Sequence, residues 1–262
     1  MTGAPVIRAE VGFPPTTEDL KYADWIPGLP EGMLTSVTFS VFLAVGIIIC
    51  FFLFSFRNAK LVPTRKQWVA ESVYGFVRDG IARDMIGPEG IRFAAYFTTL
   101  FTFIAVTNLM GIIPGIQNSP NSHIAFPAML AVITWVIYHF VGVKKHGFFG
   151  YLKASCIPGG TPWYMYPLII PLELLQNFIL RPVTLAVRLF ANMFAGHMIL
   201  VVFILGGVTL LEAGGWLMAA SPLAFLMAIV MSFFEFFVML LQAYVFTLLS
   251  AVYVQGSLAD EH

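Results

Sequence analysis

Residues 179–205 read ILRPVTLAVRLFANMFAGHMILVVFIL, and the middle of this apolar stretch carries an arginine, Arg188. A guanidinium group stays protonated at any pH at which proteins fold, so Arg188 cannot become neutral in apolar surroundings. If the stretch crosses a membrane, an ionised residue at such a depth predicts a functional site. The interpretation of Arg188 therefore depends on whether the chain is a membrane protein.

The composition is that of an integral membrane protein. The 262 residues are 59% hydrophobic and only 11% charged, and the mean hydropathy is +0.85, whereas soluble domains carry about 25% charged residues. The formal net charge is zero, which gives no indication of nucleic-acid binding. The two cysteines, Cys50 and Cys156, lie in an apolar run and in a basic loop, so we expect neither a disulfide nor a metal site.

Five apolar runs are long enough to cross a hydrocarbon core of about 30 Å. They cover residues 34–56, 93–113, 125–143, 164–206 and 222–254. We therefore predict an all-α polytopic membrane protein with five transmembrane helices. In residues 67–86, apolar side chains recur at helical spacing between charged ones, which predicts an amphipathic helix on the cytoplasmic membrane surface.

The apolar runs form one membrane domain, residues 34–254, between two polar segments. Residues 1–33 are a Pro-rich, acidic arm without the basic-then-apolar order of a cleavable signal peptide. Residues 255–262 form a polar tail. We therefore expect an arm, a membrane domain and a tail, with an uncleaved first span.

Lysine and arginine residues predict the orientation of the chain. They cluster at 57–92 and 144–153, whereas the links at 114–124 and 207–221 have none. The positive-inside rule places the two basic loops in the cytoplasm. With five crossings, the amino terminus is then outside and the carboxyl terminus is cytoplasmic.

The fourth apolar run is too long for an upright span. A helix over residues 164–206 would measure about 65 Å, twice the thickness of the bilayer core. Pro171 and Pro182 could divide the run into two spans, which would place the carboxyl terminus outside. We favour one long, tilted helix, because its first half carries Glu173 and Arg181, which a lipid-exposed span disfavours.

The last two helices carry a set of polar residues. Asn192 follows Arg188 by one turn on the same face, and His197 faces the opposite side. In the final run, Glu235 and Gln242 are seven residues apart and share a face.

An antiparallel arrangement of the two helices predicts how these residues align. If Gln242 lies at the same membrane depth as Arg188, then His197 and Glu235 lie at a similar depth to each other, in the outer half of the membrane. Glu173 lies on the inner half. Groups that can exchange protons would then reach from both surfaces, separated by an arginine that never releases its proton.

The segments RPVTLAVRLFANMFAGH (181–197) and LQAYVFTLLSAVY (241–253) resemble the a subunit of bacterial F-type ATP synthases. The resemblance covers nearly the whole chain and is most specific in these two segments. It implies a stator that faces a rotating ring of c subunits, each with one membrane carboxylate. Arg188 matches the essential arginine of the family, Asn192 a nearby amide, and Gln242 the glutamine that faces the arginine.

The resemblance also assigns the two half-channels. His197 and Glu235 match the outer pair, with the acid and the imidazole exchanged relative to some relatives. Glu173 matches the inner carboxylate, although it lies one residue further from Pro182 than in many relatives. The link at 114–124 lacks an aspartate that some relatives carry. The candidates for the outer mouth are Asn121, Ser122 and His123.

The implied mechanism couples proton flow to ATP synthesis. A proton enters from outside, neutralises a ring carboxylate, and leaves to the cytoplasm after nearly a full turn, while Arg188 blocks direct leakage. The implied partners are the c-subunit ring, the b subunits of the peripheral stalk, protons and the lipid bilayer of a bacterial plasma membrane. We expect no cofactor, no metal, no nucleic acid and no catalytic activity of the chain itself. No G-x-x-x-x-G-K-[ST] motif occurs, so we expect no bound nucleotide.

Three other functions agree less well with the sequence. A self-contained proton-coupled secondary transporter, the main alternative, commonly shows internal repeats, and none is visible. An intramembrane protease or hydrolase would require a motif such as H-E-x-x-H or G-x-S-x-G, which is missing. A haem or quinone protein would require paired histidines on facing spans, which are missing as well.

Overall fold

The computed structural model describes residues 36–112, 119–156 and 163–259, and their regular structure is helical throughout. The α-helices are α1 (Ser36–Phe56), α2 (Arg65–Val77), α3 (Asp84–Ile86), α4 (Ala94–Leu109), α5 (Ala125–His146), α6 (Phe148–Cys156), α7 (Tyr166–Leu174), α8 (Arg181–Ala213) and α9 (Ser221–Leu258). Within these residues, five helical segments are long and apolar enough to span a membrane. This confirms the predicted all-α polytopic fold. The expected arm at 1–33 and the end of the tail lie outside the described residues.

The fourth apolar run is a single helical segment. A π-helical turn, Leu175–Leu180, joins α7 to α8, so the segment Tyr166–Ala213 is continuous over 48 residues. Neither Pro171 nor Pro182 breaks it. Its length is about 72 Å at 1.5 Å per residue, more than twice the bilayer core. Such a helix fits within a membrane only when it is strongly tilted.

The link between the last two long helices is shorter than the sequence suggested. Helix α8 continues to Ala213 rather than ending near residue 206. It ends where Gly214 and Gly215 adopt φ angles of 65° and 62°, which only glycine accepts without strain. A 3-10 turn, Leu217–Ala220, leads directly into α9. The side chains of residues 207–213 are compatible with a helix, so only the glycine pair ends it.

The basic segment after the third span is also more ordered than expected. Helix α5 ends at Gly147, whose φ is 74°, and α6 follows immediately where the sequence suggested a loop. Cys156 is buried at the end of α6, Cys50 is exposed on α1, and both thiols are free. The absence of a disulfide between them agrees with the sequence analysis.

The amphipathic segment is helical from Arg65 to Ile86, through α2, a π-helical turn (Arg78–Arg83) and α3. Its buried residues Val77 and Ile81 pack in one cluster with α4, α5 and α9. Trp68 and Phe76 on the same segment are exposed. The segment therefore packs against the helix bundle and also presents an apolar surface of its own.

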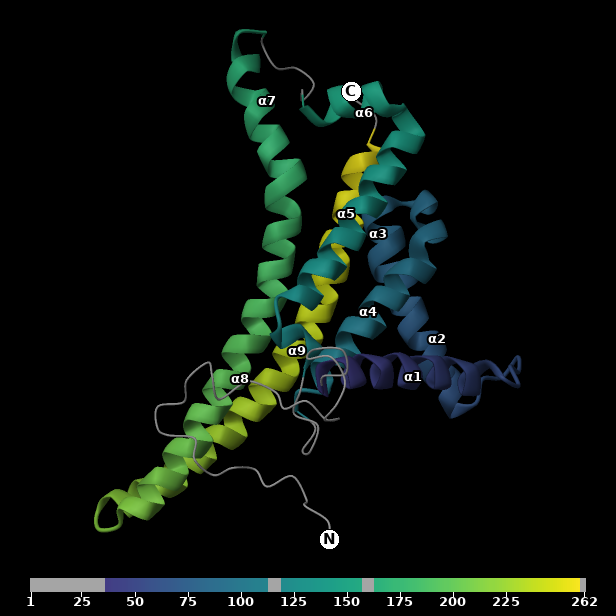
Figure 1. Cartoon of the computed structure of the whole chain (residues 1–262). Helices are drawn as coiled ribbons and strands as arrows, with labels where there is room; N and C mark the ends of the chain where they lie inside the picture. Colours follow the sequence, from purple (N-terminus) through teal and green to yellow (C-terminus); the bar gives the residue numbers. More distant parts are fainter. Residues whose placement is uncertain (1–35, 113–118, 157–162, 260–262) are drawn as a thin grey trace, which may run out of the picture.

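Helix α9 is the centre of the bundle. The main core cluster joins α9 to α4, α5 and α8 through residues such as Phe246, Ile104 and Leu189. In Figure 1, α8 and α9 run side by side through the lower part of the view, and α1 runs crosswise to them. If α1 crosses the membrane upright, the two long helices are steeply inclined to it.

The contact between α5 and α6 gives a test of this packing. A Cβ atom at Gly142 would overlap the ring of Tyr151, so we expect Gly142→Ala to destabilise the protein by about 1–3 kcal/mol. The measurement is the thermal unfolding midpoint of the purified complex. Gly46→Ala is the control, because a Cβ there meets nothing within 4 Å. Equal midpoints for the two variants would contradict the predicted packing.

Candidate functional site

Arg188 lies on the open face of α8. Leu185, Leu189 and Met193 are buried on the other face of the helix, whereas Arg188 and Asn192 are exposed. Among the described residues, none forms an ion pair with Arg188. Helix α8 therefore presents a permanent positive charge on an open face that carries no other ionisable side chain near it.

A side-chain hydrogen bond joins α8 to α9 one turn away from the arginine. Asn192 Nδ2 donates to Gln242 Oε1 over 2.7 Å, and Gln242 is only 4% exposed. The sequence analysis assumed that Gln242 is level with Arg188. Gln242 is instead bonded to the residue four positions later, about 6 Å further along the helix. The arginine and the glutamine are neighbours on adjoining turns.

Glu235 packs against a glycine of α8. Its side chain is 6% exposed, and a Cβ atom on Gly196 would lie 2.8 Å from its Oε1. His197, the next residue, is half-buried. The carboxylate and the imidazole therefore occur at a similar level on the two helices. Glu235 Oε2 is buried and has no hydrogen-bond partner within the described ranges.

A buried amide network adjoins this level of α9. Asn121 Nδ2 donates to Thr107 Oγ1 and to Asn108 Oδ1, each over 2.8 Å. Asn108 Nδ2 in turn donates to the carbonyl of Met239 over 3.2 Å, one turn after Glu235. Asn121 Oδ1 has no partner in the part of the chain that is described. Of the other two residues named for the outer mouth, Ser122 is half-buried and His123 is exposed.

Glu173 lies at the other end of the long helix, in a second polar cluster. Its Oε2 accepts a hydrogen bond from Asn177 Nδ2 over 3.2 Å. The same amide donates to the carbonyl of Ser155 over 2.9 Å, and the Asn177 carbonyl accepts from Tyr138 Oη over 2.8 Å. Burial and the nearby Glu173 carboxylate raise the pKa of the Cys156 thiol. The cluster therefore joins α5, the end of α6 and α7.

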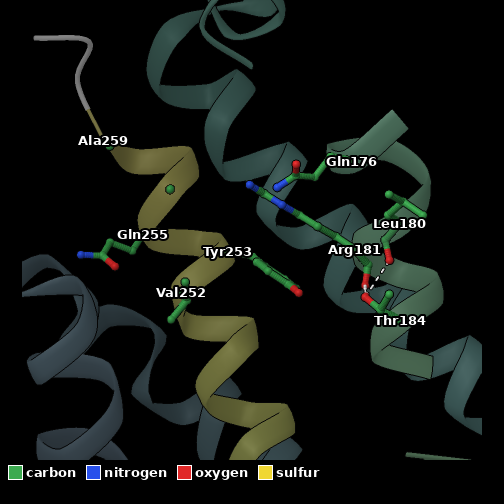
Figure 2. A pocket seen from close by; sticks show the side chains of 9 residues that line it. Gln176, Leu180, Arg181, Thr184, Val252, Tyr253, Gln255 and Ala259 are labelled. Carbon is green, nitrogen blue, oxygen red and sulfur yellow. Dashed lines mark hydrogen bonds between the residues drawn. The ribbon is translucent and has the colours of Figure 1, made fainter. Parts of the chain in front are cut away.

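An open cavity of about 480 Å³ separates the start of α8 from the end of α9. Figure 2 shows Tyr253 pointing from α9 towards Arg181 on α8. The Arg181 guanidinium lies 5.2 Å from the centre of the Tyr253 ring. Gln176, Thr184 and Gln255 add polar groups to the lining. Arg181 is seven residues before Arg188, so this cavity lies on the opposite side of Arg188 from His197.

The residues 38–255 match the sequence model of a family described as ATP synthase A chain. The chain belongs to this family. A protein of Nocardioides sp. named ATP synthase subunit a is 45% identical over 239 residues, which cover 91% of this chain and 85% of that protein. Proteins with the same name from Frankia alni and Pseudarthrobacter chlorophenolicus are 41% and 40% identical and cover 98% and 95% of this chain.

Membership of the ATP synthase A chain family establishes the general function. The chain is a multi-pass, proton-translocating membrane subunit of ATP synthase and works with other subunits in the Fo sector. This confirms the resemblance noted in the sequence. A self-contained secondary transporter is not favoured.

The sequence analysis did not identify several polar residues that the structure brings together. Asn108 and Asn177 each connect different helices through their side-chain amides. Asn108 could have been identified from the sequence, because it is an amide within the apolar run at 93–113 and such a group requires a hydrogen-bond partner inside a membrane. The contact of Tyr253 with Arg181 could not have been identified from the sequence, because tyrosine is common near the ends of membrane spans.

The Gly196–Glu235 contact gives a prediction within the site. Gly196→Ala places a methyl group where the Glu235 carboxylate now lies, so the carboxylate must move. Since small displacements of reacting groups cost large factors in rate, we expect ATP-driven proton pumping to fall roughly tenfold in membrane vesicles. Gly75→Ala, where a Cβ meets nothing within 4 Å, serves as the control. Unchanged pumping in Gly196→Ala would show that the position of Glu235 is unimportant.

Proposed function

We propose that Arg188 is the stator charge that meets the membrane carboxylates of a c-subunit ring. The observation that carries this proposal is the exposure of Arg188 on the open face of α8, within a long apolar span. A permanent cation on such a surface is stable in a membrane only beside water or an anionic partner. An ionised ring carboxylate that passes this face supplies such a partner, and its attraction to Arg188 is strong because the surroundings are apolar.

The outer half-channel, in this proposal, follows His197 and Glu235. Glu235 Oε2, Asn121 Oδ1 and Gln242 Nε2 are buried polar atoms without hydrogen-bond partners among the described residues. Buried polar atoms are normally satisfied, and ordered water is the usual remaining partner. Water at these atoms would connect the amide network of Asn121 with Glu235 and with the Asn192–Gln242 pair. A proton that enters from outside would thus reach the ring beside Arg188.

The inner half-channel, in the same proposal, opens through the cavity between α8 and α9. The cavity begins at Thr184, about 6 Å from Arg188 along α8, in the direction away from His197. Its lining includes polar groups, with Gln176, Arg181 and Thr184 on one side and Tyr253 on the other. Glu173 lies further along the same helix and would accept the proton that leaves the ring.

The separation of the two paths is the essential feature of the proposed mechanism. A protonated ring carboxylate is neutral and can turn through lipid, whereas an ionised one stays near Arg188. A proton therefore crosses only when the ring turns, because Arg188 cannot itself carry a proton from one path to the other. Moving one charge through 100 mV provides about 2.3 kcal/mol, so several protons are needed for each ATP. Catalysis of ATP synthesis then resides in other subunits, and this chain is not catalytic.

The proposed setting is a bacterial plasma membrane with the carboxyl terminus in the cytoplasm. Lys144, Lys145 and Arg92 lie near the end of α9, which agrees with a cytoplasmic end under the positive-inside rule. We propose the b subunits of the peripheral stalk as further partners, in contact with helices away from α8. The exposed apolar side chains of α1, such as Phe42 and Leu53, suit either these subunits or lipid.

The first test replaces the proposed stator charge. We expect Arg188→Ala, assembled with its native partner subunits in inverted membrane vesicles, to abolish ATP-driven proton pumping. Passive proton leak through the membrane sector should rise, because the fixed charge between the two paths is gone. Arg57→Ala removes a charge outside the spans and serves as the control. Normal pumping in an assembled Arg188→Ala complex would contradict the proposed role.

A second test compares two carboxylates. Glu235 is buried against α8, whereas Glu212 is exposed in the last turn of that helix. We expect Glu235→Gln to reduce proton-driven ATP synthesis strongly and Glu212→Gln to leave it nearly unchanged, since only Glu235 would exchange protons. Both substitutions keep the size of the side chain. Equal losses of activity would overturn the assignment of the outer half-channel.

A further inference from the structure

A second, larger cavity lies at one end of the bundle, away from α8. It has a volume of about 680 Å³ and is lined by the segment before α4, the second half of α5, and Leu258 at the end of α9. Helices α4 and α5 both pack on α9 and are bridged by a hydrogen bond between Tyr96 and Thr134, whose hydroxyl oxygens are 3.0 Å apart. The cavity opens beyond this bridge, where the two helices no longer share a contact of this kind.

The rim of the cavity is positively charged. Arg92, Lys144 and Lys145 line it together with one carboxylate, Glu89, which leaves two positive charges in excess (three minus one). The Arg92 guanidinium lies 4.8 Å from the centre of the Phe93 ring and 3.5 Å from a Glu89 oxygen. Lys145 Nζ donates to the Leu258 carbonyl over 2.6 Å. Contacts within the chain therefore hold two of the three cationic side chains, Arg92 and Lys145, at the rim of the cavity.

The rest of the lining is apolar and continues along the outside of α5. Val136 and Phe140 are 50% and 66% exposed and lie on one helix face with Lys144, at intervals of four residues. This face extends about 12 Å from Lys144 towards the middle of the span. An apolar strip that ends at a cluster of cations has the two parts that an anionic lipid requires.

We propose that this cavity binds the phosphate headgroup of an anionic phospholipid, with an acyl chain along the Val136–Phe140 strip. Cationic pockets between membrane helices, near the end of a span, attract anionic headgroups, and each Lys or Arg near the surface contributes about 1 kcal/mol. A soluble anion would gain nothing from the apolar strip. The inference is independent of the proton path, because no residue of the cavity belongs to it.

The test uses the complete ATP synthase in liposomes of phosphatidylcholine. These contain a trace of phosphatidylglycerol with a photoactivatable group in its acyl chain. We expect the probe to label the α5 peptide that carries Val136 and Phe140. The double variant R92Q/K144Q removes two positive charges from the cavity. Labelling of this peptide should then fall by a factor of roughly five, if only one of the charges contributes to binding, to roughly thirty, if both do.

Three controls separate the site from general attraction to the membrane. The variant R92K/K144R keeps both charges and should label like the unmodified protein, and R57Q/K60Q removes two charges elsewhere and should also label normally. A phosphatidylcholine probe should label this peptide weakly. Equal labelling by both probes, or undiminished labelling in R92Q/K144Q, would overturn the proposal. So would the absence of any labelling, which would mean that another subunit covers the cavity in the complex.

Discussion

The antiparallel packing of α8 on α9 fixes the depth of every polar group in the two long helices. The helices meet in a nearly constant register through the pairs Gly207/Phe225, Gly196/Glu235, Asn192/Gln242 and Arg181/Tyr253. Two of these contacts depend on glycine, because a Cβ at Gly196 or Gly207 would lie within about 3 Å of the partner side chain. The close approach sets one helix against the other, and the proposed half-channels depend on that alignment.

Polar side chains in this membrane domain fall into two groups with different energetic consequences. Amides such as Asn108 and Asn177 bond across helices and so fasten the bundle. Glu235 and Gln242 keep a buried atom without a partner in the described segments, at a cost of about 1–3 kcal/mol for each unsatisfied group. Such a cost is acceptable where water or a further subunit completes the bonding, which is what a proton path between subunits provides.

The π-helical turn Leu175–Leu180 lies between Glu173 and Arg188 on the long fourth helical segment. A π turn closes its hydrogen bonds over five residues instead of four and so takes up one additional residue. One additional residue rotates the part of the helix before the turn by about 100° relative to the part after it. The turn therefore influences which face of the segment Glu173 occupies relative to Arg188. Turns of this kind are frequent at functional sites.

The sequence by itself determined the five spans, the long fourth helix and the exceptional position of Arg188, because a membrane requires long apolar runs and makes any charge within them conspicuous. The tertiary structure decided the register, in which Gln242 bonds to Asn192 rather than lying level with Arg188. It also decided the network of Asn108 and Asn121. The physical reason is that helical periodicity fixes faces and rise within one helix, whereas side-chain packing alone sets how far two helices slide and rotate against each other.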